Sequence, residues 1–175
     1  MTNSKSQLHK AEMGLKASVE GFAHEHIAAG ILMKRYQNVS LVDLPLSPYD
    51  IIIVFKKEGK EDIIRCQVKT ATKSLSFVGG VRGGVDRTYK SDVKKYIQST
   101  STSDLVIGVS PKQNKNINEF DLYFVPTILV ERLGQNSISL NKIEAFKNNY
   151  DILEKCKDKE FVLKKAREIG LLEFY

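Results

Sequence analysis

Two apolar runs separated by a polar, glycine-containing loop constrain the fold of this chain more than any other feature. The first run, Ile51 to Phe55, consists of four β-branched residues and a phenylalanine. The second run, IIRCQVKTAT at 63–72, follows the loop KKEGKED. β-Branched residues favour strands, and a polar loop with a glycine is typical of a hairpin turn. Residues 49–72 are therefore predicted to form an antiparallel hairpin whose first strand is buried.

Helical and strand patterns alternate along the rest of the chain. Residues 8–36 contain no proline and predict a long helix, with a break near Gly21 and an apolar stripe formed by Leu8, Ala11, Leu15, Val19 and Phe22. After the hairpin we expect a strand that enters a glycine-rich loop, a lysine-rich helix over 91–98, and two core strands in DLVIGVS (104–110) and DLYFVPTILVE (121–131). A C-terminal strand near 136 and short helices near 141–150 and 158–170 follow, where Asn141 and Glu144 resemble a capping box. This order indicates an α/β fold with a central mixed β-sheet flanked by helices.

Length and composition indicate one globular domain. The 175 residues suffice for a single core, and 42% hydrophobic with 27% charged residues is typical of a globular protein. We expect a single domain over 1–175, with a core at about 8–131 and the C-terminal strand and helices, about 136–175, packed on it. The sequence contains neither a membrane-spanning apolar run nor a secretion signal, which predicts a cytoplasmic protein without membrane contact. Cys66 and Cys156 lie far apart without zinc-site spacing, so neither a disulfide framework nor a zinc site is expected.

Polar residues with metal-binding chemistry gather at one end of the predicted hairpin. Gln67 and Lys69 point to the same face of their strand, because side chains alternate between faces. Asp50 enters the partner strand beside that pair if the two strands pair as a hairpin. A carboxylate and an amide oxygen suit a hard cation such as Mg²⁺, and a lysine beside them can position or deprotonate a nucleophile. The alternative is a surface hairpin in which Asp50 caps a turn and the other two side chains are solvated.

The segment SPYDIIIVFKKEGKEDIIRCQVKTAT resembles the signature of the PD-(D/E)XK nuclease superfamily, in particular its Q-x-K branch of small intron-homing, restriction and resolvase-like endonucleases. The resemblance covers about residues 12–130 and implies a restriction-endonuclease-like core. It implies that Asp50 is the central metal ligand, Gln67 and the Val68 carbonyl are further ligands, and Lys69 is the catalytic lysine. The usual proline before the aspartate is displaced to Pro48, and a glutamine stands where an acidic ligand is common.

The same resemblance implies a glutamate on the preceding helix, and Glu12, Glu20 and Glu25 are the candidates. We favour Glu25 as a catalytic and metal-binding residue, because it interrupts an apolar helical face formed by Phe22, Ala28, Ala29 and Leu32. The alternative is that Glu25 lies at the edge of that face and reaches water. His24 and His26 are two positions apart on a helix and point in different directions, so we expect two partly exposed histidines rather than a zinc site.

A basic segment follows the hairpin. Between Lys69 and Lys95 there are seven basic residues and two acids, which gives 7 − 2 = +5 of the chain's net +6. The expected DNA-binding residues are Lys73, Arg82, Arg87, Lys90 and Lys94. The glycine-rich stretch GGVRGGVDR lacks the pattern of a phosphate-binding P-loop. The alternative is a solvated, lysine-rich surface with a plain hairpin tip.

These features lead us to expect a Mg²⁺-dependent endodeoxyribonuclease, with Mn²⁺ as an alternative metal, in restriction, homing or defence. Two alternatives stay open: a resolvase for Holliday junctions or other branched DNA, and a catalytically inactive DNA-binding subunit. Because a duplex has two strands to cut, a homodimer or higher homo-oligomer is a further expectation.

Overall fold

A computed structural model describes residues 2–44, 47–57, 59–80, 95–112 and 119–173 of the chain, with side chains from Glu12 onward except that of Lys57. In chain order its elements are α1 (Thr2–Met33), β1 (Val39–Leu41), β2 (Ile51–Lys57), β3 (Lys60–Thr70), β4 (Ser74–Ser76), β5 (Val78–Gly79), β6 (Tyr96–Ile97), β7 (Leu105–Pro111), β8 (Phe120–Pro126), α2 (Thr127–Leu133), β9 (Ser137–Ser139), the 3-10 helix η1 (Leu140–Phe146), α3 (Tyr150–Glu154) and α4 (Lys159–Glu168).

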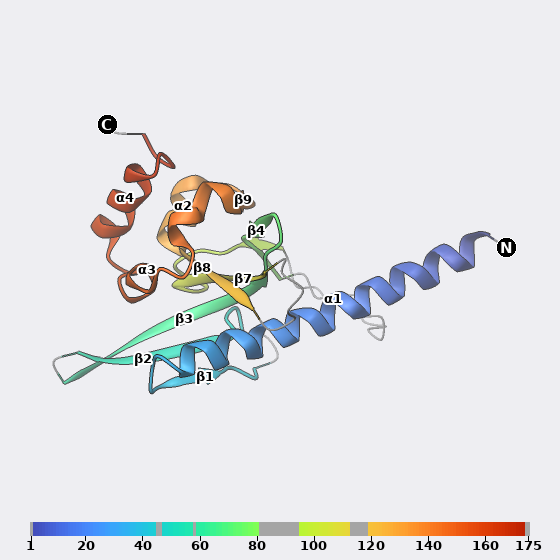
Figure 1. Cartoon of the computed structure of the whole chain (residues 1–175), viewed down its shortest axis with the longest axis horizontal. Helices are drawn as coiled ribbons and strands as arrows, with labels where there is room; N and C mark the ends of the chain where they lie inside the picture. The colour runs from blue at the N-terminus through green and yellow to red at the C-terminus, as the bar shows by residue number, and fades with distance from the viewer. Residues whose placement is uncertain (1, 45–46, 58, 81–94, 113–118, 174–175) are drawn as a thin grey trace.

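The main sheet has five strands in the order β1-β2-β3-β7-β8 (Figure 1). Neighbouring strands are antiparallel except β3 and β7, which run parallel, so the sheet is mixed as predicted. β2 and β3 form the predicted antiparallel hairpin, from Lys57 opposite Lys60 to Ile51 opposite Cys66. The β-branched run is buried on alternate residues, since Ile51 and Ile53 are fully inaccessible. The chain therefore has the predicted α/β fold.

The helices divide between two parts of the sheet. α1 runs past β1, β2 and β3, whereas α2, α3 and α4 gather on the β7 and β8 side (Figure 1). The C-terminal half of α1 contributes Ala28, Ala29 and Leu32 to the core, but its N-terminal half projects away from the rest of the molecule. None of the helices in the described part of the chain is long and apolar enough to cross a membrane.

α1 differs from the prediction in two respects. It begins at Thr2 and continues through Gly21 without a break. The apolar stripe does not enter the core where side chains are described, since Leu15, Val19 and Phe22 are 58%, 61% and 63% exposed. Only the following turns of the helix reach the sheet, so packing begins near His24.

Three further predictions of local structure are wrong. The stretch predicted as one strand over 121–131 is a strand only to Pro126. Helix α2 then runs from Thr127 to Leu133 and is capped by Gly134, which adopts a left-handed conformation with φ of 61°. Tyr96 and Ile97, expected within a lysine-rich helix, instead form β6 and pair with β5, while positions 91–94 lie outside the described residues. The capping box does not form: η1 begins after Ser139, and the Glu144 carboxylate contacts Tyr123 and Lys147.

Candidate active site

Asp50 is held where the hairpin begins. Its backbone N–H donates to the Cys66 carbonyl at 2.9 Å, which extends the β2–β3 ladder by one residue and brings Asp50 beside the polar end of β3. The carboxylate oxygen Oδ2 accepts a hydrogen bond from the Val68 backbone N–H at 2.7 Å and another from the Gln67 side-chain amide. Asp50 thus does not cap a turn in the manner of a surface hairpin, and Gln67 is buried at 8% exposure rather than solvated.

Lys69 lies close enough to Asp50 and Glu25 to interact with both charges, and the Asp50 charge acts on Glu25. Burial lowers the pKa of the Lys69 ammonium, while the carboxylates of Asp50 and Glu25 oppose that change. Burial, and secondarily the Asp50 charge, raises the pKa of Glu25 to about 7. The pKa of Asp50 is raised by burial, against the hydrogen bond from Val68 and the charge of Lys69. The structure therefore brings Glu25, Asp50, Gln67, Val68 and Lys69 together, a group called the Asp50 cluster below.

The Asp50 cluster has the donor chemistry of a hard-cation site. Asp50 and Glu25 are carboxylates from different parts of the chain, and the positive charge of Lys69 opposes the rise in the pKa of both. A divalent cation would oppose both causes that raise the pKa of Glu25, first burial and then the Asp50 charge, and oxygen ligands of this kind suit Mg²⁺. Because the cluster relies on an amide and a backbone carbonyl, it is not a group of three His, Cys, Asp or Glu side chains, and the described residues contain no such group.

The Gln67 side chain is not oriented for metal binding in this structure. The amide nitrogen Nε2 of Gln67, and not its oxygen, faces Asp50 and also lies 3.3 Å from the Val68 carbonyl oxygen. A cation between Asp50 and Gln67 would require the amide to turn over, because only its oxygen can coordinate a metal. The residues fit a metal site once that amide is turned.

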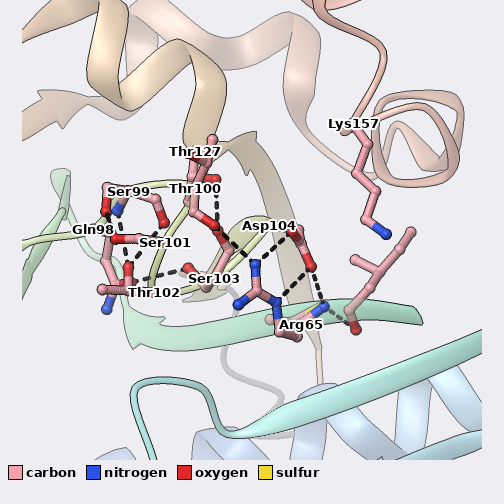
Figure 2. A network of polar contacts seen from close by, with 12 residues as sticks. Arg65, Gln98, Ser99, Thr100, Ser101, Thr102, Ser103, Asp104, Thr127 and Lys157 are labelled. Carbon is pink, nitrogen blue, oxygen red and sulfur yellow. Dashed lines mark hydrogen bonds and ion pairs between the residues drawn. The ribbon is translucent and has the colours of Figure 1, made fainter. Parts of the chain in front are cut away.

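Sequence reasoning missed Gln98, which holds the far end of the Gln67 amide. Gln98 is completely buried, and its Nε2 donates to Gln67 Oε1 at 3.1 Å. Its own oxygen accepts hydrogen bonds from the Thr102 and Ser103 hydroxyls at 2.7 and 2.9 Å, as Figure 2 shows. The Ser/Thr-rich stretch after β6 has the composition of a linker, and no spacing motif connects it with the hairpin.

His24 also differs from its prediction. It is buried at 4% exposure rather than partly exposed, and its Nδ1 forms a hydrogen bond of 2.7 Å with the Thr70 hydroxyl at the end of β3. His26 is exposed, with its Nδ1 2.9 Å from the Phe22 carbonyl of the preceding turn. This hydrogen bond joins α1 to the end of β3. Because Glu25 follows His24 directly, the same contact holds Glu25 near the polar end of the hairpin.

The expected DNA-binding residues are only partly described. Lys73 is exposed in the turn between β3 and β4, and its carbonyl accepts the Leu140 backbone N–H at 3.1 Å. Lys95 is exposed immediately before β6. The remaining residues, Arg82, Arg87, Lys90 and Lys94, lie outside the described residues.

Comparison with known proteins adds information on the fold. No protein-family model and no curated protein matches the chain. Among solved structures, the bacterial homing endonuclease I-Ssp6803I superposes with a TM-score of 0.53 over 86% of this chain and 95% of that one, at 11% sequence identity. The conclusion from the sheet order, the flanking helices and this superposition is that the chain has the fold seen in a homing endonuclease.

Proposed function

We propose that this protein is a Mg²⁺-dependent endodeoxyribonuclease of the PD-(D/E)XK superfamily, in its Q-x-K branch. The observation that carries the proposal is the Asp50 cluster: two carboxylates, a buried amide and a half-buried lysine meet at the end of one hairpin. The fold shared with a homing endonuclease is consistent with this assignment.

The side chains of the Asp50 cluster divide the reaction between them. Asp50, Glu25, the Val68 carbonyl and the turned Gln67 amide would hold Mg²⁺, which when bound neutralises phosphate charge and lowers the pKa of a water ligand. Lys69 would contact the attacking water or the scissile phosphate. Its lowered pKa makes the neutral, proton-accepting form of the amine more accessible than that of an exposed lysine, which suits removal of a proton from the nucleophile.

DNA would approach along the basic segment that follows β3. Each Lys or Arg that neutralises a phosphate releases a condensed counterion, so a segment of net charge +5 favours a polyanion. Two copies acting together on a duplex would present one site to each strand, which is why we include a homodimer in the proposal.

The test is incubation of supercoiled plasmid and of a four-way junction with the protein in Mg²⁺, Mn²⁺ or EDTA. We expect cutting of linear or plasmid duplex in either metal and none in EDTA. The Asp50→Asn variant is the matched control, because the amide retains an acceptor for the Val68 N–H while removing the charge; it should fold and fail to cut. Preference for the junction would assign a resolvase, and DNA binding without metal-dependent cutting would assign an inactive DNA-binding subunit.

A further inference from the structure

Gln98 has a hydrogen-bond partner for both ends of its buried side chain. Two hydroxyls donate to its oxygen, and its Nε2 donates to Gln67. An amide can only donate from nitrogen and only accept at oxygen. Since the oxygen of Gln98 is turned toward Thr102 and Ser103, its nitrogen faces Gln67, the Gln67 oxygen is occupied, and the Gln67 nitrogen is left to face Asp50.

We propose that Gln98 is a positioning residue that sets which end of the Gln67 amide faces Asp50. The part of the inference that concerns metal binding by Gln67 rests on the proposed function. The Gln67 oxygen can face a cation beside Asp50 only if both amides turn together. The Gln67 nitrogen would then donate to the Gln98 oxygen, and the Gln98 nitrogen would donate to the hydroxyls.

The Thr102 hydroxyl can accommodate the turned state, whereas the buried Ser103 hydroxyl favours the observed one, because it donates to the Gln98 oxygen. The Thr102 hydroxyl already accepts the Ser99 backbone N–H at 2.9 Å, and the Ser99 carbonyl lies 2.9 Å away as a second acceptor for its proton. Its proton can therefore move to Ser99 when the Gln98 nitrogen replaces the Gln98 oxygen. A hydroxyl is both donor and acceptor, so neither orientation leaves Thr102 without a hydrogen bond.

Hydrogen bonds hold the backbone around Gln98 at several points, so its side-chain amide can rotate without movement of the backbone. Residues 98–104, called the polar strap here, are drawn in Figure 2. The Thr100 carbonyl accepts from Arg65 Nη2 at 2.8 Å, and its N–H donates to Glu131 at 2.8 Å. The Thr127 hydroxyl donates to the Ser103 carbonyl at 2.7 Å. Gln98 itself donates its backbone N–H to the Phe77 carbonyl at 2.8 Å.

The test uses Gln98→Glu, because an ionised carboxylate can accept but cannot donate to the Gln67 oxygen. The readout is the amide orientation of Gln67 in metal-free protein by ¹⁵N-edited NOE spectroscopy, recorded at a pH above the pKa of the new carboxyl, which its ¹³C shift reports. In the wild type the Gln67 Nε2 protons and the Val68 amide proton converge on one Asp50 oxygen, so a strong NOE between them is expected. Gln98→Glu should abolish this NOE and leave the fold intact. Ser101→Ala is the control: it removes a hydroxyl that contacts Ser99 and should retain the NOE.

An unchanged NOE in folded Gln98→Glu, with the carboxyl ionised, would overturn the inference. Mn²⁺ binding, followed by electron paramagnetic resonance, tests the metal separately. Groups behind metal ligands alter affinity by roughly 10- to 100-fold, and we expect Gln98→Glu to tighten Mn²⁺ binding by about 10-fold. The double variant Gln67→Met/Gln98→Glu should bind Mn²⁺ no more tightly than Gln67→Met alone. This result would exclude a general effect of the added charge. Loss of the NOE without Mn²⁺ binding would support the role of Gln98 and count against the proposed nuclease.

Discussion

Asp104 accepts three hydrogen bonds from one residue, Arg65: from its backbone N–H at 2.8 Å, from Nε at 3.0 Å and from Nη2 at 2.9 Å. The carboxylate is 10% exposed and the guanidinium side chain 31%, so the pair is only partly screened by water. It joins the end of the polar strap to the middle of β3 (Figure 2).

Asp104→Ala should therefore destabilise the protein, because it removes the charged partner of the Arg65 guanidinium and the acceptor of the Arg65 backbone N–H. We expect a loss of about 3 kcal/mol in the free energy of unfolding, the lower end of the range for breaking a buried pair. Urea denaturation followed by circular dichroism measures it. Lys165→Ala, which removes an exposed ion pair with Glu168, is the control and should leave the midpoint unchanged. Equal midpoints for Asp104→Ala and the wild type would contradict this prediction.

Lys69→Met should lower the single-turnover rate of DNA cleavage by at least about 100-fold, the usual contribution of a positioned proton-transfer group. Thermal stability should stay the same or rise, because burial disfavours the charged form of this lysine and methionine fills similar space. Lys56→Met, at an exposed lysine of β2, should cut at the wild-type rate. Retained metal-dependent cutting by folded Lys69→Met would exclude Lys69 from the chemistry.

Gln67→Glu should retain cleavage and reach half-maximal activity at a lower Mg²⁺ concentration. The change adds a carboxylate beside Asp50 and makes amide orientation irrelevant, since both carboxylate oxygens can coordinate a hard cation. A Mg²⁺ titration of the cleavage rate measures the shift. Complete loss of cutting in a folded variant would instead indicate that the Gln67 amide donates to the substrate.

Glu25 should make the metal-free protein less stable as the pH rises from about 4.5 to about 7. Its pKa in the folded state is about 7, raised first by burial and then by Asp50, above the ordinary value of 4.5. The folded protein thus holds a proton over this window that the unfolded chain has lost, so stability falls with rising pH. Glu25→Gln cannot ionise and should show a flatter pH dependence of the unfolding midpoint in EDTA. Parallel profiles for the two proteins would show that Glu25 ionises as it does in the unfolded chain.

The double variant Arg82→Ala/Arg87→Ala should bind DNA more weakly and with a lower dependence on salt. Each lost phosphate contact should reduce the log–log salt slope by about 0.9. Fluorescence anisotropy of labelled duplex over a range of salt concentrations measures the slope, with Lys142→Ala/Lys164→Ala on the C-terminal helices as a control of equal charge. Saturating DNA at low salt should recover most of the cutting rate, if the arginines contribute uniform binding. An unchanged slope would place the DNA-binding surface elsewhere.

The hairpin could be predicted from sequence because its information is local. Alternation places Gln67 and Lys69 on one face, and the turn fixes the register that brings Asp50 beside them. Glu25 could be identified because a carboxylate interrupts an apolar helical face, which is also a local pattern. The structure brings these residues together, and their roles in catalysis stay predictions.

Gln98 could not be found in this way, because its partner Gln67 belongs to a different element and nothing in the spacing connects them. For a different reason, the sequence does not predict α2. Its first residues, TILV, have strand propensity, but Pro126 ends β8 and the following turns are buried against the sheet through Leu129 and Val130, so tertiary packing overrides propensity. His24 is buried because Thr70 offers it a partner, which again depends on a long-range contact.

The parallel pairing of β3 with β7 implies an order in which the chain assembles. β2 and β3 are joined by a short turn, so the hairpin can close rapidly and bring Asp50 to Gln67 and Lys69 with little loss of chain entropy. Pairing Cys66 with Leu105 requires a much longer loop to close, and only then can the polar strap deliver Gln98 to Gln67. The side chains of the hairpin therefore meet early in folding, and the orientation of the Gln67 amide is settled last, when β7 joins the sheet.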